Sequence, residues 1–206
     1  KLMKLYDTRL RQIVEIKPST KGVLKIYACG PTVYRDAHVG NMRTFLLTDL
    51  IKRLAQYQGL QVELIQNITD VGHMADDFVG DDKMLSEAKK TNTDPFEIAR
   101  RYEARFHEDL KRLNVIQADS YPKASQTISE MISAIEKLIS SQHAYVGSDG
   151  SIYFDATSFP SYGAISGNRL DSLKPGHRYE YTDEGGKRFH ADWALWKSAG
   201  GRTEMI

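Results

Sequence analysis

Cysteine is almost absent from this sequence, because Cys29 is the single one in 206 residues. A chain with one cysteine cannot form an internal disulfide. Disulfides are rare in the proteins of reducing compartments. The low cysteine content therefore leads us to expect a cytoplasmic protein.

Long apolar runs and an excess of one charge are also missing. No run approaches the ~20 apolar residues that cross a bilayer, and no signal peptide is visible, so we expect no membrane association. Lys and Arg number 28 against 27 Asp and Glu, a formal net charge of +1. This balance predicts no general attraction to nucleic acid and leaves a local basic patch open. The first residue is Lys1 rather than Met, from which we expect residues to precede it.

The chain has enough apolar residues, 41%, for one domain or two small ones. Apolar and polar side chains alternate over residues 24–28, and a glycine lies on either side of this stretch. The pattern predicts a strand. Residues 41–58 carry apolar side chains at helical spacing, and residues 61–66 alternate again. Strand, helix and strand in this order predict a parallel pair with a right-handed crossover, in which ligands bind beyond the carboxyl ends of the strands.

The second half of the chain has a different pattern. A helix is expected to start at Asp94-Pro95, and another is expected over residues 125–142. Residues 144–146 and 151–154 flank a glycine-containing turn and predict a hairpin. Residues 157–190 are rich in Gly, Pro, Ser and charge, so we expect loops there.

One polar run, residues 28–41, joins the first strand to the first helix. Its sequence is Ala-Cys-Gly-Pro-Thr-Val-Tyr-Arg-Asp-Ala-His-Val-Gly-Asn. A helix start offers free N–H groups and partial positive charge to a phosphate, and His38 and Asn41 can donate hydrogen bonds there. Gly40 lets a ligand approach the backbone. From the residues alone, a cap or packing residue is the more common role for such a histidine as His38, and a small buried apolar residue the more common one for a lone cysteine such as Cys29. Zinc needs three or four protein ligands, which the composition does not predict.

This run resembles the first active-site segment of cysteinyl-tRNA synthetases, and residues 38–41 resemble the His-Ile-Gly-His motif of class I synthetases. Further segments resemble the same family in the same order along nearly the whole chain. They are residues 67–73 (Asn-Ile-Thr-Asp-Val-Gly-His), 80–83, 109–115, 121–125, 153–155, 162–163 and 192–197.

The resemblance implies an α/β fold: the first half of a class I synthetase Rossmann (HUP-like) domain with parallel strands, plus an α+β connective insertion. We expect residues 1–116 to form that half, residues 117–190 the insertion, and residues 191–206 the start of the return to the catalytic domain. The family's Lys-Met-Ser-Lys-Ser loop, second Rossmann half and anticodon-reading region do not occur in these 206 residues. We therefore interpret the chain as an N-terminal portion and expect it to be inactive in isolation.

The resemblance also assigns site residues. His38 and Asn41 are implied to be catalytic, with Asn41 a neutral donor where the family has a second His. The residues implied to bind ATP are Thr32, His38, Gly40 and Asn41. Those implied to bind the substrate cysteine are Cys29, Gly30, Thr32 and Thr69.

Cys29 is further implied to be one ligand of a catalytic Zn²⁺, which would also bind the thiolate of the substrate and so discriminate against serine. The family's other zinc ligands would lie beyond Ile206. His73 and His190 could substitute in principle, but we expect each to be an exposed or structural histidine. Mg²⁺ is expected to accompany ATP.

The function implied is activation of cysteine with ATP to cysteinyl-adenylate, followed by transfer to tRNA(Cys). The partners would be ATP, cysteine and tRNA(Cys). Two alternatives stay open: the cysteine ligase of mycothiol biosynthesis, which transfers cysteine to an amino sugar, and a non-catalytic module that binds nucleotide or tRNA. The sequence leaves the oligomeric state open.

Overall fold

The computed structural model describes residues 3–72, 89–168 and 186–198, and the chain divides into two compact units. Unit one comprises Lys1–Leu5 and Val14–Thr127, and unit two comprises Tyr6–Ile13 and Ile128–Ile206. This division does not test which residues form an inserted domain, so the predicted boundaries at 116 and 190 stay predictions. Within the described ranges, no helix combines the length and apolarity needed to cross a membrane.

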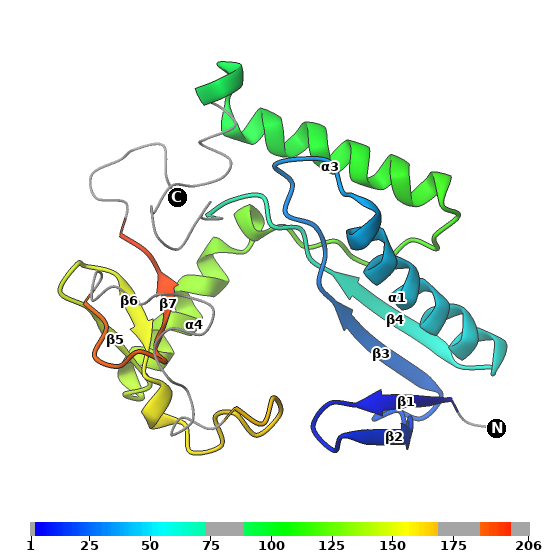
Figure 1. Ribbon diagram of the computed structural model, residues 1–206, viewed down its shortest axis with the longest axis horizontal. Helices are drawn as coiled ribbons and strands as arrows, with labels where there is room; N and C mark the ends of the chain where they lie inside the picture. The colour runs from blue at the N-terminus through cyan, green and yellow to red at the C-terminus, as the bar shows by residue number, and fades with distance from the viewer. Residues whose placement is uncertain (1–2, 73–88, 169–185, 199–206) are drawn as a thin grey trace. The chain divides into compact units, whose positions relative to one another are not determined.

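Unit one is built on a parallel strand pair joined by a helix, which confirms the predicted strand–helix–strand unit. Strand β3 (Val23–Ala28) pairs in parallel with β4 (Gln61–Gln66), in a register that runs from Val23 opposite Gln61 to Ala28 opposite Gln66. Helix α1 (Val39–Tyr57) connects them and lies along the pair (Figure 1). Ala55 of α1 packs with Leu24 and Met3 in a buried cluster that covers one face of the sheet.

Helix α3 (Pro95–Arg112) begins where the sequence predicts. Asp94 is its N-cap and accepts a hydrogen bond from Phe96 N at 3.1 Å, while Pro95 takes the first turn, where its missing N–H costs nothing. The buried face of α3 packs on the N-terminal half of α1. The ring of Phe106 meets that of Phe45 edge to face, with centroids 5.3 Å apart.

The segment after α3 returns beside β4. Gln66 N donates to Ser120 O at 3.1 Å and Ile68 N to Pro122 O at 2.8 Å, so residues 120–123 extend the sheet on that side. Two buried charged residues of α1 anchor this return. Asp49 accepts from Ile116 N at 2.8 Å, and Lys52 donates to Gln117 O at 2.9 Å.

The first two strands of the chain were not predicted. Strand β1 (Lys4–Asp7) and strand β2 (Gln12–Glu15) pair with each other in a two-stranded sheet. Asp7 caps the connecting turn by accepting from Arg9 N and Leu10 N. The strands are short and mostly exposed, so they lack the apolar alternation by which a strand is found.

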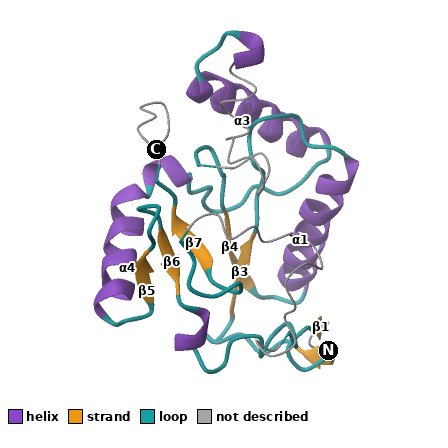
Figure 2. Ribbon diagram, turned by 60° about the vertical axis from the view of Figure 1, so that its left-hand side comes forward, coloured by secondary structure: helices purple, strands orange, loops and turns teal. Residues whose placement is uncertain are grey.

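Unit two packs one helix against a small antiparallel sheet (Figure 2). Helix α4 (Ile128–Ser140) is followed by β5 (Ala144–Val146), β6 (Ile152–Phe154) and β7 (Trp193–Trp196), in the sheet order β5-β6-β7. The predicted hairpin is confirmed. The helix expected over residues 125–142 is shorter, because Ala124–Gln126 form a separate 3₁₀ turn. A second 3₁₀ turn, Ala156–Ser158, follows β6.

The core of unit two contains a buried polar network. Asp192 is 1% exposed and accepts hydrogen bonds from the Tyr145 hydroxyl and from Ala156 N. The Tyr145 oxygen accepts in turn from Arg188 N at 2.8 Å, and the Arg188 guanidinium lies 4.2 Å from the centre of the tyrosine ring. This network ties β5 and the start of β7 to the turn after β6.

Candidate functional site

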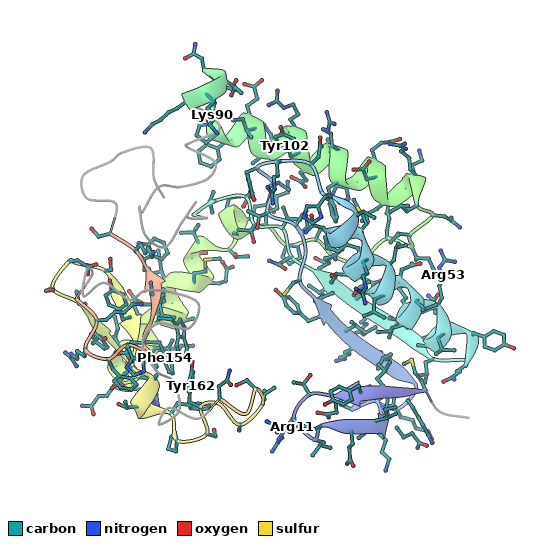
Figure 3. All side chains as sticks on the ribbon, in the orientation of Figure 1. Arg11, Arg53, Lys90, Tyr102, Phe154 and Tyr162 are labelled. Carbon is teal, nitrogen blue, oxygen red and sulfur yellow. The ribbon has the colours of Figure 1, made fainter. Side chains whose placement is uncertain are left out.

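A cavity of about 260 Å³ lies beyond the carboxyl end of β3, in the region that the strand order predicts. Most of its wall is the run of residues 29–37. The start of α1 supplies Asn41, Thr44 and Phe45, and α3 supplies Phe106 and Tyr102, which is labelled in Figure 3. Of the predicted site residues, Cys29, Gly30, Thr32 and Asn41 line this cavity, whereas His38, Gly40 and Thr69 lie outside its lining.

His38 is the N-cap of α1. Its Nδ1 accepts from Gly40 N at 3.1 Å and Asn41 N at 3.4 Å, and Asn41 Oδ1 accepts from His38 N at 3.0 Å. This reciprocal pair is a capping box with an imidazole in place of the usual hydroxyl. With Nδ1 accepting these bonds, Nε2 is the ring nitrogen left to act as a donor.

The cap changes the interpretation of Gly40 as well. A Cβ added at position 40 would lie 2.9 Å from Cε1 of His38, so the glycine makes room for the histidine ring over the helix start. The amides of Gly40 and Asn41 already have Nδ1 as their partner. A phosphate at this point would therefore meet His38 Nε2–H and the Asn41 side-chain amide first.

Thr32 and Thr69 are neighbours, because the two strands pair again beyond their ends. Thr69 N donates to Pro31 O at 3.0 Å, and Val33 N donates to Thr69 O at 3.1 Å. This pairing brings together two residues that lie 37 positions apart and that the resemblance assigns to the same substrate.

Two residues that the sequence did not single out hold the Cys29–Gly30 peptide. Gln66 Nε2 donates to Cys29 O at 3.3 Å, and Asn67 Oδ1 accepts from Gly30 N at 2.9 Å. Asn67 belongs to the recognised run of residues 67–73, but nothing in the sequence shows which atoms its amide would meet. Cys29 itself is exposed.

A bidentate ion pair joins the cavity wall to α3. Arg105 Nε lies 2.5 Å from Asp36 Oδ1, and Arg105 Nη2 lies 2.7 Å from Asp36 Oδ2. Asp36 lines the cavity, so the pair holds that part of the wall in a fixed relation to α3. The two residues are 69 positions apart in the sequence, and no local sequence pattern predicts the pair.

The described residues do not form a zinc site. Among residues 3–72, 89–168 and 186–198, no three His, Cys, Asp or Glu side chains cluster so as to hold a metal. Cys29 is one donor at the cavity. His190 belongs to unit two, where its ring packs on Phe189, and His73 and residues 80–83 lie outside the described residues. Zinc binding by Cys29 stays a prediction that needs further donors.

Comparison with known families identifies the class of protein. Residues 15–204 match the model of the tRNA synthetases class I (C) catalytic domain, and the chain belongs to this family. A solved structure shares the fold: the agnB2 LeuRS of Agrobacterium radiobacter K84, in a ternary complex with tRNA and LeuAMS. It superposes with a TM-score of 0.51 at 15% identity, over 69% of this chain and 17% of the LeuRS chain. The expected α/β synthetase fold is thus confirmed.

The more similar curated relatives are all cysteine--tRNA ligases. The ligase of Deinococcus radiodurans is 44% identical over 196 residues, which are 95% of this chain and 39% of that protein. A ligase of Thermus thermophilus is 41% identical over 95% of this chain and 40% of its own length. That of Pyrococcus furiosus is 40% identical over 96% and 39%. The chain spans about two fifths of the length of the relatives it matches.

Proposed function

We propose that this chain forms the ATP- and cysteine-binding part of a cysteine--tRNA ligase. The observation that carries the proposal is the cavity beyond β3, where Cys29, Gly30, Thr32 and Asn41 converge beside the capped start of α1. Family membership and relatives of 40–44% identity support the same reaction. The single cysteine supports a reducing, cytoplasmic setting.

The proposed reaction has two steps. A carboxylate oxygen of cysteine attacks the α-phosphorus of ATP, the bond from that phosphorus to the bridging oxygen breaks, and pyrophosphate leaves with the electron pair. The 3′-terminal ribose hydroxyl of tRNA(Cys) then attacks the carbonyl carbon of cysteinyl-adenylate and loses its proton, and AMP leaves. Positioning and stabilisation of charge are what the protein must supply in both steps.

His38 and Asn41 would stabilise the negative charge that builds on the phosphate oxygens. Nε2–H of His38 and the side-chain N–H of Asn41 are donors, and the positive end of the α1 dipole adds to them. Thr32 and Gly40 would contact ATP beside them. Mg²⁺ is proposed as the counter-ion of the ATP phosphates, which carry more charge than these hydrogen-bond donors offset.

The amino-acid subsite is proposed at Cys29, Gly30, Thr32 and Thr69, where the two strand ends pair. In the family a zinc ion bound there would select a thiolate over a hydroxyl. The described donors do not complete such a site, so the roles proposed above depend only on the chain's own side chains.

Cysteine-dependent exchange of pyrophosphate into ATP tests the proposal, with the protein expressed from its complete reading frame. We expect exchange with cysteine and at least about tenfold less with serine. Adding tRNA(Cys) to the preformed adenylate should release AMP, whereas release by an amino sugar would mean the mycothiol-type ligase. ATP binding without any exchange would mean a non-catalytic module and would refute the proposal.

A further inference from the structure

The parallel pairing of unit one contains an extra residue at the edge of the cavity. The strand register ends with Ala28 opposite Gln66 and resumes with Thr32 opposite Thr69. Residues 29, 30 and 31 therefore face only residues 67 and 68, as in a β-bulge. At such a point the backbone ladder cannot supply partners for every N–H and C=O group.

Two side chains supply the missing partners for one peptide group. Gln66 Nε2 donates to the carbonyl of Cys29 at 3.3 Å, and Asn67 Oδ1 accepts from the N–H of Gly30 at 2.9 Å. The carbonyl of Cys29 and the N–H of Gly30 belong to the same peptide group. Hydrogen bonds therefore hold the plane of this peptide at its acceptor and at its donor. Gln66 is only 4% exposed, which limits competition by water.

Close packing reinforces these bonds. A Cβ at position 30 would lie 1.7 Å from Asn67 O and 3.1 Å from Cγ of Gln66. The backbone at Gly30 therefore approaches the end of β4 to a distance that only glycine allows. The Asn67 amide nitrogen also lies 3.5 Å from Thr69 Oγ1. One side chain thus contacts both Gly30 and Thr69, the two halves of the proposed amino-acid subsite.

We propose that Gln66 and Asn67 are positioning residues that fix the Cys29–Gly30 peptide and thereby the wall of the cavity that Cys29 and Gly30 form. The identity of the ligand in this inference rests on the proposed function, whereas the hydrogen bonds to the peptide do not. It requires a donor at position 66 and an acceptor at position 67.

Two measurements on the protein from the complete reading frame test this inference. The first is hydrogen exchange of the Gly30 amide, followed by mass spectrometry of overlapping peptides. The second is the concentration of a sulfamoyl analogue of cysteinyl-adenylate that half-protects Cys29 from iodoacetamide. The variants are Asn67→Ala, Asn67→Asp and Gln66→Met. Gln61→Ala, an exposed amide on the same strand, is the matched control.

Asn67→Ala should speed exchange at Gly30 and raise the half-protecting concentration, each by about fivefold, the equivalent of one neutral hydrogen bond. Asn67→Asp keeps an acceptor and should retain the slow exchange of Gly30. Gln66→Met keeps the side-chain volume but loses the donor, and should weaken protection by a similar factor. Gln61→Ala should change neither quantity. Asn67→Ser replaces Asn67→Ala if the latter does not fold.

The outcomes separate the two proposals. Unchanged exchange at Gly30 in Asn67→Ala would overturn the inference. Faster exchange with unchanged protection of Cys29 would also overturn it, because the peptide would be held without consequence for the ligand. If the analogue fails to protect Cys29 even in the wild-type protein, the proposed function fails at this cavity, and the exchange rates alone then decide whether the side chains hold the peptide.

Discussion

The guanidinium of Arg105 binds both carboxylate oxygens of Asp36, at 2.5 and 2.7 Å, and so connects α3 to the wall of the proposed nucleotide cavity. Both side chains are about half exposed, with 59% and 47% of their surface accessible. Solvent screens such a pair, so its effect on overall stability is small. Its main consequence is for the shape of the cavity.

We expect Arg105→Gln and Asp36→Asn each to weaken ATP binding by up to about fivefold and to change the free energy of unfolding by less than about 1 kcal/mol. Calorimetric titration of ATP into both single variants and the double variant measures this. The double variant should bind ATP about as well as either single variant. Strictly additive losses would mean that the two side chains act separately.

The capping role of His38 predicts that stability and rate can be separated. His38→Ala should lower the free energy of unfolding by about 1 kcal/mol through loss of the cap, and slow cysteine-dependent pyrophosphate exchange by ~10²-fold. His38→Asn should restore the cap but not the rate, since its shorter side chain lacks the Nε2–H donor. Thermal melts and exchange assays on the same preparations measure both effects. Recovery of the rate in His38→Asn would show that His38 is a cap only.

Gly30→Ala is expected to be strongly destabilising. Its Cβ would overlap Asn67 O, at 1.7 Å, and the backbone must move by at least a bond length to relieve the contact. A cost of about 3 kcal/mol is expected, the upper range for overpacking. Gly22→Ala is the matched control: φ is +78° and nothing lies within 4 Å, so only about 1 kcal/mol of backbone strain is added. Denaturant titration compares the two, and equal costs would refute the close approach.

Alkaline pH should destabilise unit two. Burial raises the pKa of Tyr145 to about 12 and the pKa of Tyr153 to about 12. In the unfolded chain a tyrosine loses its proton near pH 10. A folded pKa above the unfolded one gives stability that is complete below about pH 10 and is lost as the pH rises to about 12.

The free energy of unfolding, measured by denaturant titration at several pH values from about 9 to about 12, checks this expectation. Tyr153→Phe should make the decline less steep. Tyr57→Phe alters a tyrosine that is 90% exposed and should leave the slope as it is. A slope that is identical in all three proteins would contradict the assignment.

Asp192→Ala should destabilise unit two by about 3 kcal/mol. The substitution leaves the Tyr145 hydroxyl and Ala156 N buried without their acceptor. Asp155→Ala also removes an acceptor of two bonds, from Thr157 N and Thr157 Oγ1, but these are exposed and water replaces them. It should cost only about 1 kcal/mol. Similar melting temperatures for the two variants would mean that the Asp192 network contributes little.

The sequence predicted those parts of the fold that are encoded locally. The second strand of the pair, β4, begins and ends where its alternation does, and α1 begins two residues before the predicted start because His38 caps it. Asp94 and Pro95 mark the start of α3 through chemistry confined to one turn. The location of the cavity followed from strand order alone.

Contacts between distant segments could not be predicted in this way. The return of residues 120–123 beside β4 and the Arg105–Asp36 pair each depend on how helices pack, and neither leaves a periodic pattern. The helix expected from residue 125 starts at Ile128 because Asp70, 55 residues earlier, binds Ser125 through both its backbone N–H and its hydroxyl. The roles of His38, Asn41, Cys29 and Thr69 stay predictions until the assays above are done.

The extra residue between Ala28 and Thr32 decides which side chain stands beside Thr69. If the one-to-one pairing continued past Ala28 with no bulge, Pro31 would take the register position of Thr32, and a residue with neither a hydroxyl nor an N–H would face the second strand end. A pairing that slipped by one residue would therefore exchange the side chains of the run between the two faces of the pair.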